Sequence, residues 1–155
     1  ITVKGLGDYT NDIGNLKVGD GASVEGPFGM FSSKYAKEKE QIWIAGGIGI
    51  TPFLSLCKDV YTHKVKLFWC VKNKEEAVYA DELNEMSKKY PNFEFTIWSS
   101  KESGYITADN FGVTDFTDKA YLICGPQILK DGIIKQLQEK GVKRDAVYDE
   151  EFAFR

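Results

Sequence analysis

The sequence predicts an α/β protein with a doubly wound, five-stranded parallel sheet. Short apolar runs rich in β-branched and aromatic residues alternate with longer segments of helical pattern from residue 41 onward. Turn-forming glycines or helix-starting residues follow several of these runs. Because strands and helices alternate, we expect all strands to run parallel and helices to cover both faces of the sheet. The expected strands are 42–45, 65–71, 93–98, 121–124 and 146–148.

Local signals delimit the helices between these strands. Thr51 is the expected N-cap of the first helix, with Pro52 at its first helical position. A second helix is expected over 81–90, where a proline directly follows. The last helix follows a Gly-Pro pair and spans about 126–140, with Gly141 as its C-terminal stop.

Residues 1–32 have a different pattern, and we interpret them as a separate unit from residues 33–155. Residues 1–4 alternate like an edge strand, 18–21 have the composition of a turn, and 22–26 lead into another strand. No complete core can be drawn from this stretch alone. We therefore expect it to be the last part of a β domain whose beginning lies outside the sequence, and the chain to be a piece of a longer protein.

Composition excludes several classes of function. A net charge of −3 provides no basic surface for nucleic acid. The three cysteines lie in apolar stretches and are odd in number, which favours reduced thiols in a cytoplasmic setting. A single histidine and no Cys-x-x-Cys pair argue against a zinc site. No apolar run approaches the ~20 residues that a membrane helix needs.

A glycine-rich turn after the first strand is the strongest candidate for chemistry. Glycines let the backbone approach a phosphate closely, and the following helix presents unpaired amides to an anion. A bare Gly-x-Gly is common in tight turns, and a proline at position 52 breaks the GxGxxG pattern. The residues of this turn are Gly46, Gly47, Ile48, Gly49, Ile50, Thr51 and Pro52.

This string resembles the pyrophosphate loop of the ferredoxin–NADP reductase superfamily. Four further segments resemble that family's motifs in the family's order. Gly7-Asp8-Tyr9-Thr10 is similar to the element that holds the FAD pyrophosphate, and Gly26-Pro27-Phe28-Gly29 to the turn that ends the flavin domain. Cys124-Gly125-Pro126 is similar to the loop beside the nicotinamide, and Glu151-Phe152 to the C-terminal segment whose ring covers the flavin. The resemblance implies an NAD(P)H-binding domain at 33–155, preceded at 1–32 by the C-terminal remnant of an FAD-binding β-barrel.

Within the superfamily the N-terminal motif is most similar to the NADPH oxidase and ferric reductase branch. That resemblance implies a parent that takes a hydride from NADPH onto FAD and passes electrons to the haem of a transmembrane domain, at the cytoplasmic face of the cell membrane. The family's earlier flavin motif, Arg-x-Tyr-Ser or His-Pro-Phe-Thr, is absent from the sequence. The alternatives are a soluble reductase that serves a ferredoxin, an oxygenase or free flavin, and a nucleotide-binding module without turnover.

The resemblance assigns roles in hydride transfer to Thr51, Cys124 and Phe152. Thr51 would orient the nicotinamide and flavin, although capping a helix would also explain it. Cys124 would pack beside the nicotinamide, the alternative being a small buried hydrophobic residue. Phe152 would cover the flavin until the nicotinamide enters, or would anchor the last strand.

The end of the third strand is the expected site of the adenosine half of the coenzyme. Ser99, Ser100 and Lys101 would hold a 2′-phosphate there, and Tyr105 would stack on adenine. These residues favour NADPH over NADH. Lysine lacks the bidentate fork of arginine, and the neighbouring Glu102 acts against a phosphate.

Overall fold

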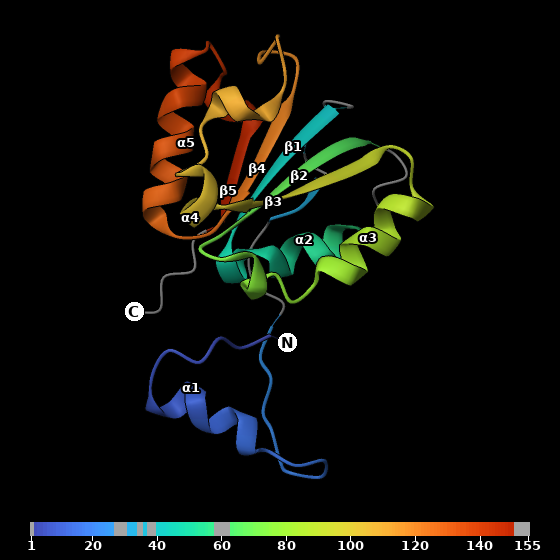
Figure 1. Ribbon diagram of the computed structural model, residues 1–155, viewed down its shortest axis with the longest axis vertical. Helices are drawn as coiled ribbons and strands as arrows, with labels where there is room; N and C mark the ends of the chain where they lie inside the picture. Colours follow the sequence, from blue (N-terminus) through green and yellow to red (C-terminus); the bar gives the residue numbers. More distant parts are fainter. Residues whose placement is uncertain (1, 27–30, 34–35, 37–39, 58–62, 151–155) are drawn as a thin grey trace. The chain divides into compact units, whose positions relative to one another are not determined.

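The computed structural model describes residues 2–26, 31–33, 36, 40–57 and 63–150. The chain divides into two compact units, Ile1–Met30 and Phe31–Arg155. The first unit contains α1 (Asp8–Asp12) and a 3-10 turn, η1 (Ile13–Asn15). The second contains a sheet with helices on both of its faces (Figure 1).

The sheet has five strands in the order β3-β2-β1-β4-β5, and every neighbouring pair is parallel. This confirms the fold class predicted from the sequence. The strands are β1 (Glu40–Gly46), β2 (Lys64–Val71), β3 (Phe93–Ser99), β4 (Ala120–Cys124) and β5 (Val147–Glu150). The predicted strands all appear, each within a few residues of its expected bounds.

Helices cover the sheet on both faces. The longer ones are α2 (Ile50–Leu56), α3 (Ala80–Lys89) and α5 (Gln127–Glu139), and α4 (Ser100–Ser103) is a single turn. Shorter 3-10 turns are η3 (Gly47–Gly49), η5 (Lys74–Glu76), η6 (Ala108–Phe111) and η7 (Arg144–Ala146). In Figure 1, α5 lies on one side of the sheet, and α2 and α3 lie on the other.

The strand order reverses between β1 and β4. Successive strands from β1 run outward through β2 to β3, and the chain then returns to place β4 on the other side of β1. The connections after β1 and β4 therefore diverge to opposite faces. In open α/β sheets a ligand binds at such a point, beyond the carboxyl ends of the strands.

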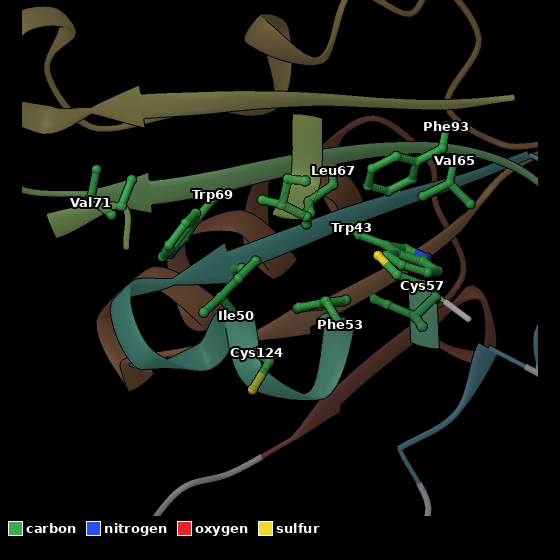
Figure 2. Close-up of a cluster of buried hydrophobic side chains, with 14 of the residues drawn as sticks. Trp43, Ile50, Phe53, Cys57, Val65, Leu67, Trp69, Val71, Phe93 and Cys124 are labelled. Carbon is green, nitrogen blue, oxygen red and sulfur yellow. The ribbon is translucent and has the colours of Figure 1, made fainter. Parts of the chain in front are cut away.

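Two buried clusters correspond to the two faces. Trp43, Phe53, Leu67, Trp69 and Leu83 belong to the cluster under α2 and α3. Figure 2 shows this cluster, with residues of β1 and β2 directed toward α2. The cluster on the other face includes Ile44, Phe111, Tyr121, Ile133 and Leu137.

The opposite edge of the sheet, where the strands begin, carries an ionic cluster. The Lys64 ammonium lies 3.1 Å from the carboxylate of Glu40, and that of Lys119 lies 3.4 Å from it. Lys119 is almost fully buried and also pairs with Asp118 at 2.5 Å. The two ammonium groups and the two carboxylates therefore balance one another in charge.

The structure corrects the predicted start of the first helix. Gly49, not Thr51, is the N-cap of α2, and Thr51 and Pro52 lie within its first turn. A 3-10 turn over Gly47–Gly49 runs directly into the helix, so the helical path begins before the Thr-Pro pair. Proline is tolerated there because the first amides of a helix have no partner within it.

The two strands expected near the N-terminus are also wrong for the residues described. Residues 2–26 contain α1 and η1 and no strand. Alternation of apolar and polar residues does not by itself supply the backbone partners that a strand requires. The expected turn is present, because Asp20 donates its backbone N–H to Lys17 O at 3.0 Å and Gly19 has a φ of 104°.

Substitution of Phe53 tests the packing of α2 on the sheet. Its fully buried ring lies 5.4 Å from the Trp43 ring, centroid to centroid. Phe53→Ala should lower the free energy of unfolding by about 3–5 kcal/mol, because the cavity cannot fully collapse. Urea unfolding measures the change. Val78→Ala, at a side chain that is 71% exposed, should change it by less than about 0.5 kcal/mol, and equal effects would contradict the packing described.

Candidate functional site

The glycine turn after β1 touches the turn after β4 backbone to backbone. A Cβ at Gly49 would lie 2.3 Å from the carbonyl oxygen of Cys124, and one at Gly46 would lie 2.7 Å from side-chain atoms of Pro126 and Leu129. A Cβ at Gly125 would in turn lie 2.8 Å from Gly46 Cα. No side chain fits in these three places. Glycine is therefore required on both turns where the strand order reverses.

Gly47 meets a different requirement. Its φ is 53°, a conformation that L-residues rarely adopt, and a Cβ there would have no heavy atom within 4 Å. The first turn thus bends sharply and leaves open space at its tip. A backbone tip without a side chain is what close approach to a phosphate requires.

Trp69 fixes this tip, a role that the sequence alone did not indicate. Its indole N–H on β2 donates to the carbonyl oxygen of Gly47 at 2.9 Å, while the ring is almost fully buried. Figure 2 shows Trp69 beside Ile50, the first residue of α2. The sequence does place Trp69 two residues before the end of β2, and β2 is the neighbour of β1, which leads into the glycine turn.

Thr51 lies directly behind the turn. Its hydroxyl donates to the carbonyl oxygen of Ile48 at 3.1 Å, so the side chain closes the turn from within the helix. Thr51 is half-buried, whereas the Ile48 side chain, next to Gly47, is exposed. The hydroxyl oxygen keeps acceptor capacity beyond this bond.

Cys124 is the last residue of β4 and is fully buried. Burial raises the pKa of its thiol from 9.0 to about 12, with a further rise from Glu150 and an opposing effect of Lys130. The side chain therefore stays a neutral thiol and acts by packing, since the thiolate is the nucleophilic form. Burial likewise raises the pKa of Cys57 and of Cys70 to about 12.

The expected adenosine end lies where β2 and β3 finish. The Ser99 hydroxyl donates to Lys72 O at 3.1 Å, and the Lys101 amide donates to the same oxygen at 3.2 Å. Ser99 is buried, so of the two serines Ser100 is the more accessible. Lys101 and Tyr105 are exposed, with Tyr105 at 89%.

An ion pair crosses this end of the sheet. The Lys74 ammonium in η5 lies 2.7 Å from a carboxylate oxygen of Glu102 in α4, next to Lys101. Three lysines, Lys72, Lys74 and Lys101, thus follow β2 and β3, and one of them is neutralised by a carboxylate. The pairing could not be inferred from the sequence, because it links two separate turns.

The first unit carries the predicted FAD element at the start of α1. The Thr10 hydroxyl oxygen accepts the backbone N–H groups of Leu6 at 2.9 Å and Gly7 at 3.1 Å. The same hydroxyl donates to Gly7 O at 3.1 Å, while Tyr9 is 82% exposed. Thr10 therefore holds the turn at Gly7 and Asp8. The predicted flavin contacts at Glu151 and Phe152 lie outside the described residues, as do Pro27, Phe28 and Gly29 of the turn that resembles the end of the flavin domain.

The described part of the chain has neither a candidate metal site nor a candidate membrane-spanning helix. No cluster of histidine, cysteine and carboxylate side chains there could hold a metal ion. No helix there has the length and apolar character needed to cross a membrane.

Comparison with known families agrees with this geometry. The family model for the oxidoreductase NAD-binding domain matches residues 43–135, which include both glycine turns. The chain belongs to this family. The match covers more than half of the chain and runs from the middle of β1 into α5.

Curated relatives include one component of the Na(+)-translocating NADH-quinone reductases. The chain is 29% identical to the protein of this name from Pseudomonas paraeruginosa and 27% identical to one from Haemophilus influenzae, over 94% of its length. It spans only 40% of the length of each relative. The relatives therefore contain more than this chain does.

Solved structures share the fold. A flavohemoglobin from Malassezia yamatoensis with bound FAD and haem matches 99% of this chain with a TM-score of 0.82 and 20% identity, over 43% of that structure. The CS-b5R domains of human Ncb5or, in an NAD+ form, match 96% of the chain with a TM-score of 0.71 and 20% identity, over 47% of that structure. The fold is that of a ferredoxin reductase-like NAD-binding domain. The expected NADPH oxidase and ferric reductase branch is not confirmed by these matches.

Gly49→Ala tests the contact between the two turns. The added Cβ would overlap the Cys124 carbonyl, so the free energy of unfolding should fall by about 1–3 kcal/mol or more. Urea unfolding measures it. Gly132→Ala is the matched control: it lies inside α5 with open space around it, and should raise stability by about 0.5–1 kcal/mol. Gly49→Ala with undiminished stability would show that the turns are farther apart than described.

The Cys124 pKa predicts a pH dependence of stability. Above about pH 9 the unfolded chain loses this proton while the folded chain keeps it, so stability falls as the pH rises toward about 12. Each such proton contributes about 1.4 kcal/mol per pH unit. Cys124→Ala should make the fall in unfolding free energy above pH 9 shallower by about this amount, measured by urea unfolding at several pH values. Parallel pH profiles for the two proteins would contradict the buried thiol.

Proposed function

We propose that this chain is the NAD(P)H-binding part of a flavin-dependent oxidoreductase, and that it presents the nicotinamide to FAD for hydride transfer. The observation that carries the proposal is the pair of glycine turns, packed backbone to backbone, at the point where the strand order reverses. Membership in the NAD-binding family supports the same ligand. The activity of the whole parent protein is part of the proposal.

The residues present fit a dinucleotide. Gly47 offers an open backbone tip for the pyrophosphate, held by Trp69 from behind. From that tip the coenzyme would extend toward Thr51, Cys124 and the Gly125-Pro126 turn with its nicotinamide half. The adenosine half would extend toward Ser100, Lys101 and Tyr105. We propose these residues, with Gly46, Ile48, Gly49, Ile50, Pro52 and Ser99 in supporting positions, as the binding site.

Hydride transfer requires alignment of two rings more than acid or base chemistry. FAD, when bound, would supply the acceptor for the hydride. Cys124 is a neutral buried thiol, and Thr51 is a hydroxyl held by its own turn. These side chains can shape and orient a ring without reacting with it. Phe152 and the segment from Gly7 to Thr10 would contact the flavin.

The choice of coenzyme depends on the charges after β2 and β3. Ser100 and Lys101 favour NADPH, in line with the sequence. The Glu102 carboxylate beside Lys101 disfavours a 2′-phosphate and neutralises Lys74. The curated relatives are named as NADH-quinone reductases. We therefore place NADH ahead of NADPH.

The parent would combine this chain with an FAD-binding domain and pass electrons to a further acceptor. The relatives, whose names are those of quinone reductases, favour a membrane-associated respiratory reductase. The haem of a transmembrane domain, inferred from the resemblance to the NADPH oxidase and ferric reductase branch, is the second candidate. In both cases the chain would lie at the cytoplasmic face of a membrane.

Calorimetry with NADH and NADPH tests the proposal directly. The folded chain should bind at least one of them, and addition of FAD should show whether the flavin changes the affinity. Failure of both coenzymes to bind to folded protein, with and without FAD, would contradict the proposal.

Glu102→Gln tests the coenzyme preference. Loss of the carboxylate removes repulsion of a 2′-phosphate and frees Lys74, so NADPH affinity should rise about three- to tenfold relative to NADH, as calorimetry would measure. Glu85→Gln is the matched control. It breaks another exposed ion pair of 2.7 Å, with Lys88 on α3, and should leave the ratio unchanged. An unchanged ratio in Glu102→Gln would show that Glu102 does not face the 2′ position.

A further inference from the structure

Two tryptophans on neighbouring strands make the same kind of contact. The Trp69 indole N–H donates to Gly47 O at 2.9 Å, and the Trp98 indole N–H donates to Gly104 O at 2.8 Å. Both acceptor glycines have positive φ, 53° and 72°. Each tryptophan thus holds a turn that only glycine adopts readily.

The two contacts lie on opposite faces of the sheet, at the end where β2 and β3 finish. Trp69 is near the end of β2 in the cluster under α2, and Trp98 is near the end of β3 against the cluster on the other face. In the sheet register Trp98 pairs with Cys70, the residue after Trp69. The two indoles therefore flank the carboxyl ends of β2 and β3.

Each held turn leads to a different part of the proposed site. Gly47 is the tip of the pyrophosphate turn. Gly104 immediately precedes Tyr105, the exposed ring proposed to stack on adenine. An indole N–H is a donor only, so each ring fixes one carbonyl direction and with it the adjoining peptide.

We propose that Trp69 and Trp98 are positioning residues for the ADP half of the coenzyme, Trp69 for its pyrophosphate and Trp98 for its adenosine. The inference rests on the proposed function. Neither indole needs to touch the ligand; each keeps a glycine turn in the binding conformation. Replacement by phenylalanine removes the donor and keeps an aromatic ring.

The test separates the two halves of the ligand. Calorimetry with ADP-ribose and NMR titration with inorganic pyrophosphate and with adenosine give affinities for each protein. Trp69→Phe should lower the affinity for ADP-ribose and for pyrophosphate about three- to tenfold, and should change the affinity for adenosine by less than about twofold. Trp98→Phe should lower the affinity for ADP-ribose and for adenosine by a similar factor, and should change the affinity for pyrophosphate by less than about twofold.

The third tryptophan is an internal control. The Trp43 indole donates to Gln41 Oε1 at 2.9 Å within β1, away from both turns. In the wild-type chain, ADP-ribose should shift the indole N–H resonances of Trp69 and Trp98 and leave that of Trp43 in place.

The outcomes separate this inference from the proposed function. If ADP-ribose binds the wild-type chain but both variants keep its affinity, the positioning role is overturned and the proposed function stands. Equal weakening of pyrophosphate and adenosine in each variant would also overturn it, because that pattern reflects general loss of structure. If the folded wild-type chain binds no ADP-ribose, both the proposed function and this inference are contradicted.

Discussion

The close backbone contact between two turns, Gly46 to Gly49 after β1 and Cys124 to Gly125 after β4, is the constraint on which the proposed site depends. β1 and β4 are adjacent and parallel, and Ala45 pairs with Cys124 at the last step of their register. The chains leaving these strands must then diverge to opposite faces. They separate within a space too small for any Cβ at three glycines.

That constraint favours this end of the sheet for the proposed site. The two turns meet through backbone atoms at Gly46, Gly49 and Gly125, and a Cβ at Gly47 would find open space. Helix α2 begins as a continuation of the same turn, so the turn cannot move without moving a helix that is packed through Phe53 into the core. Trp69 reaches the turn from the neighbouring strand and fixes it from a buried position. The packed core therefore holds the glycine turn in one conformation.

Much of this arrangement could be predicted from the sequence, and the failures have physical causes. Five strands and three main helices follow from short apolar runs, helical periodicity and the stops at Pro91 and Gly141. The start of α2 was misplaced because Thr51-Pro52 has the composition of a helix start while the 3-10 turn before it does not. The strands expected in residues 2–26 failed because alternation does not specify a pairing partner.

For the candidate site, too, some features could be predicted from the sequence and others could not. Glycine turns and their order along the chain are local features, and they identified Gly46 to Gly49 and Gly125. The bonds from Trp69 to Gly47 and from Lys74 to Glu102 join segments that are distant in sequence, about 22 and 28 residues apart, so no local pattern could reveal them. Interactions of this kind determine which conformation a glycine turn adopts and which charge a ligand meets.

The most direct test is an NMR titration of the folded chain with NADH. We expect the backbone amide resonances of Gly46, Gly47, Gly49 and Gly125 to move together as ligand is added, with smaller changes near Lys101 and Tyr105. Resonances at the opposite edge, at Glu40, Lys64 and Lys119, should stay in place. Saturable binding that moves the opposite edge and leaves the glycine turns unchanged would contradict the central claim that these two turns form the dinucleotide site.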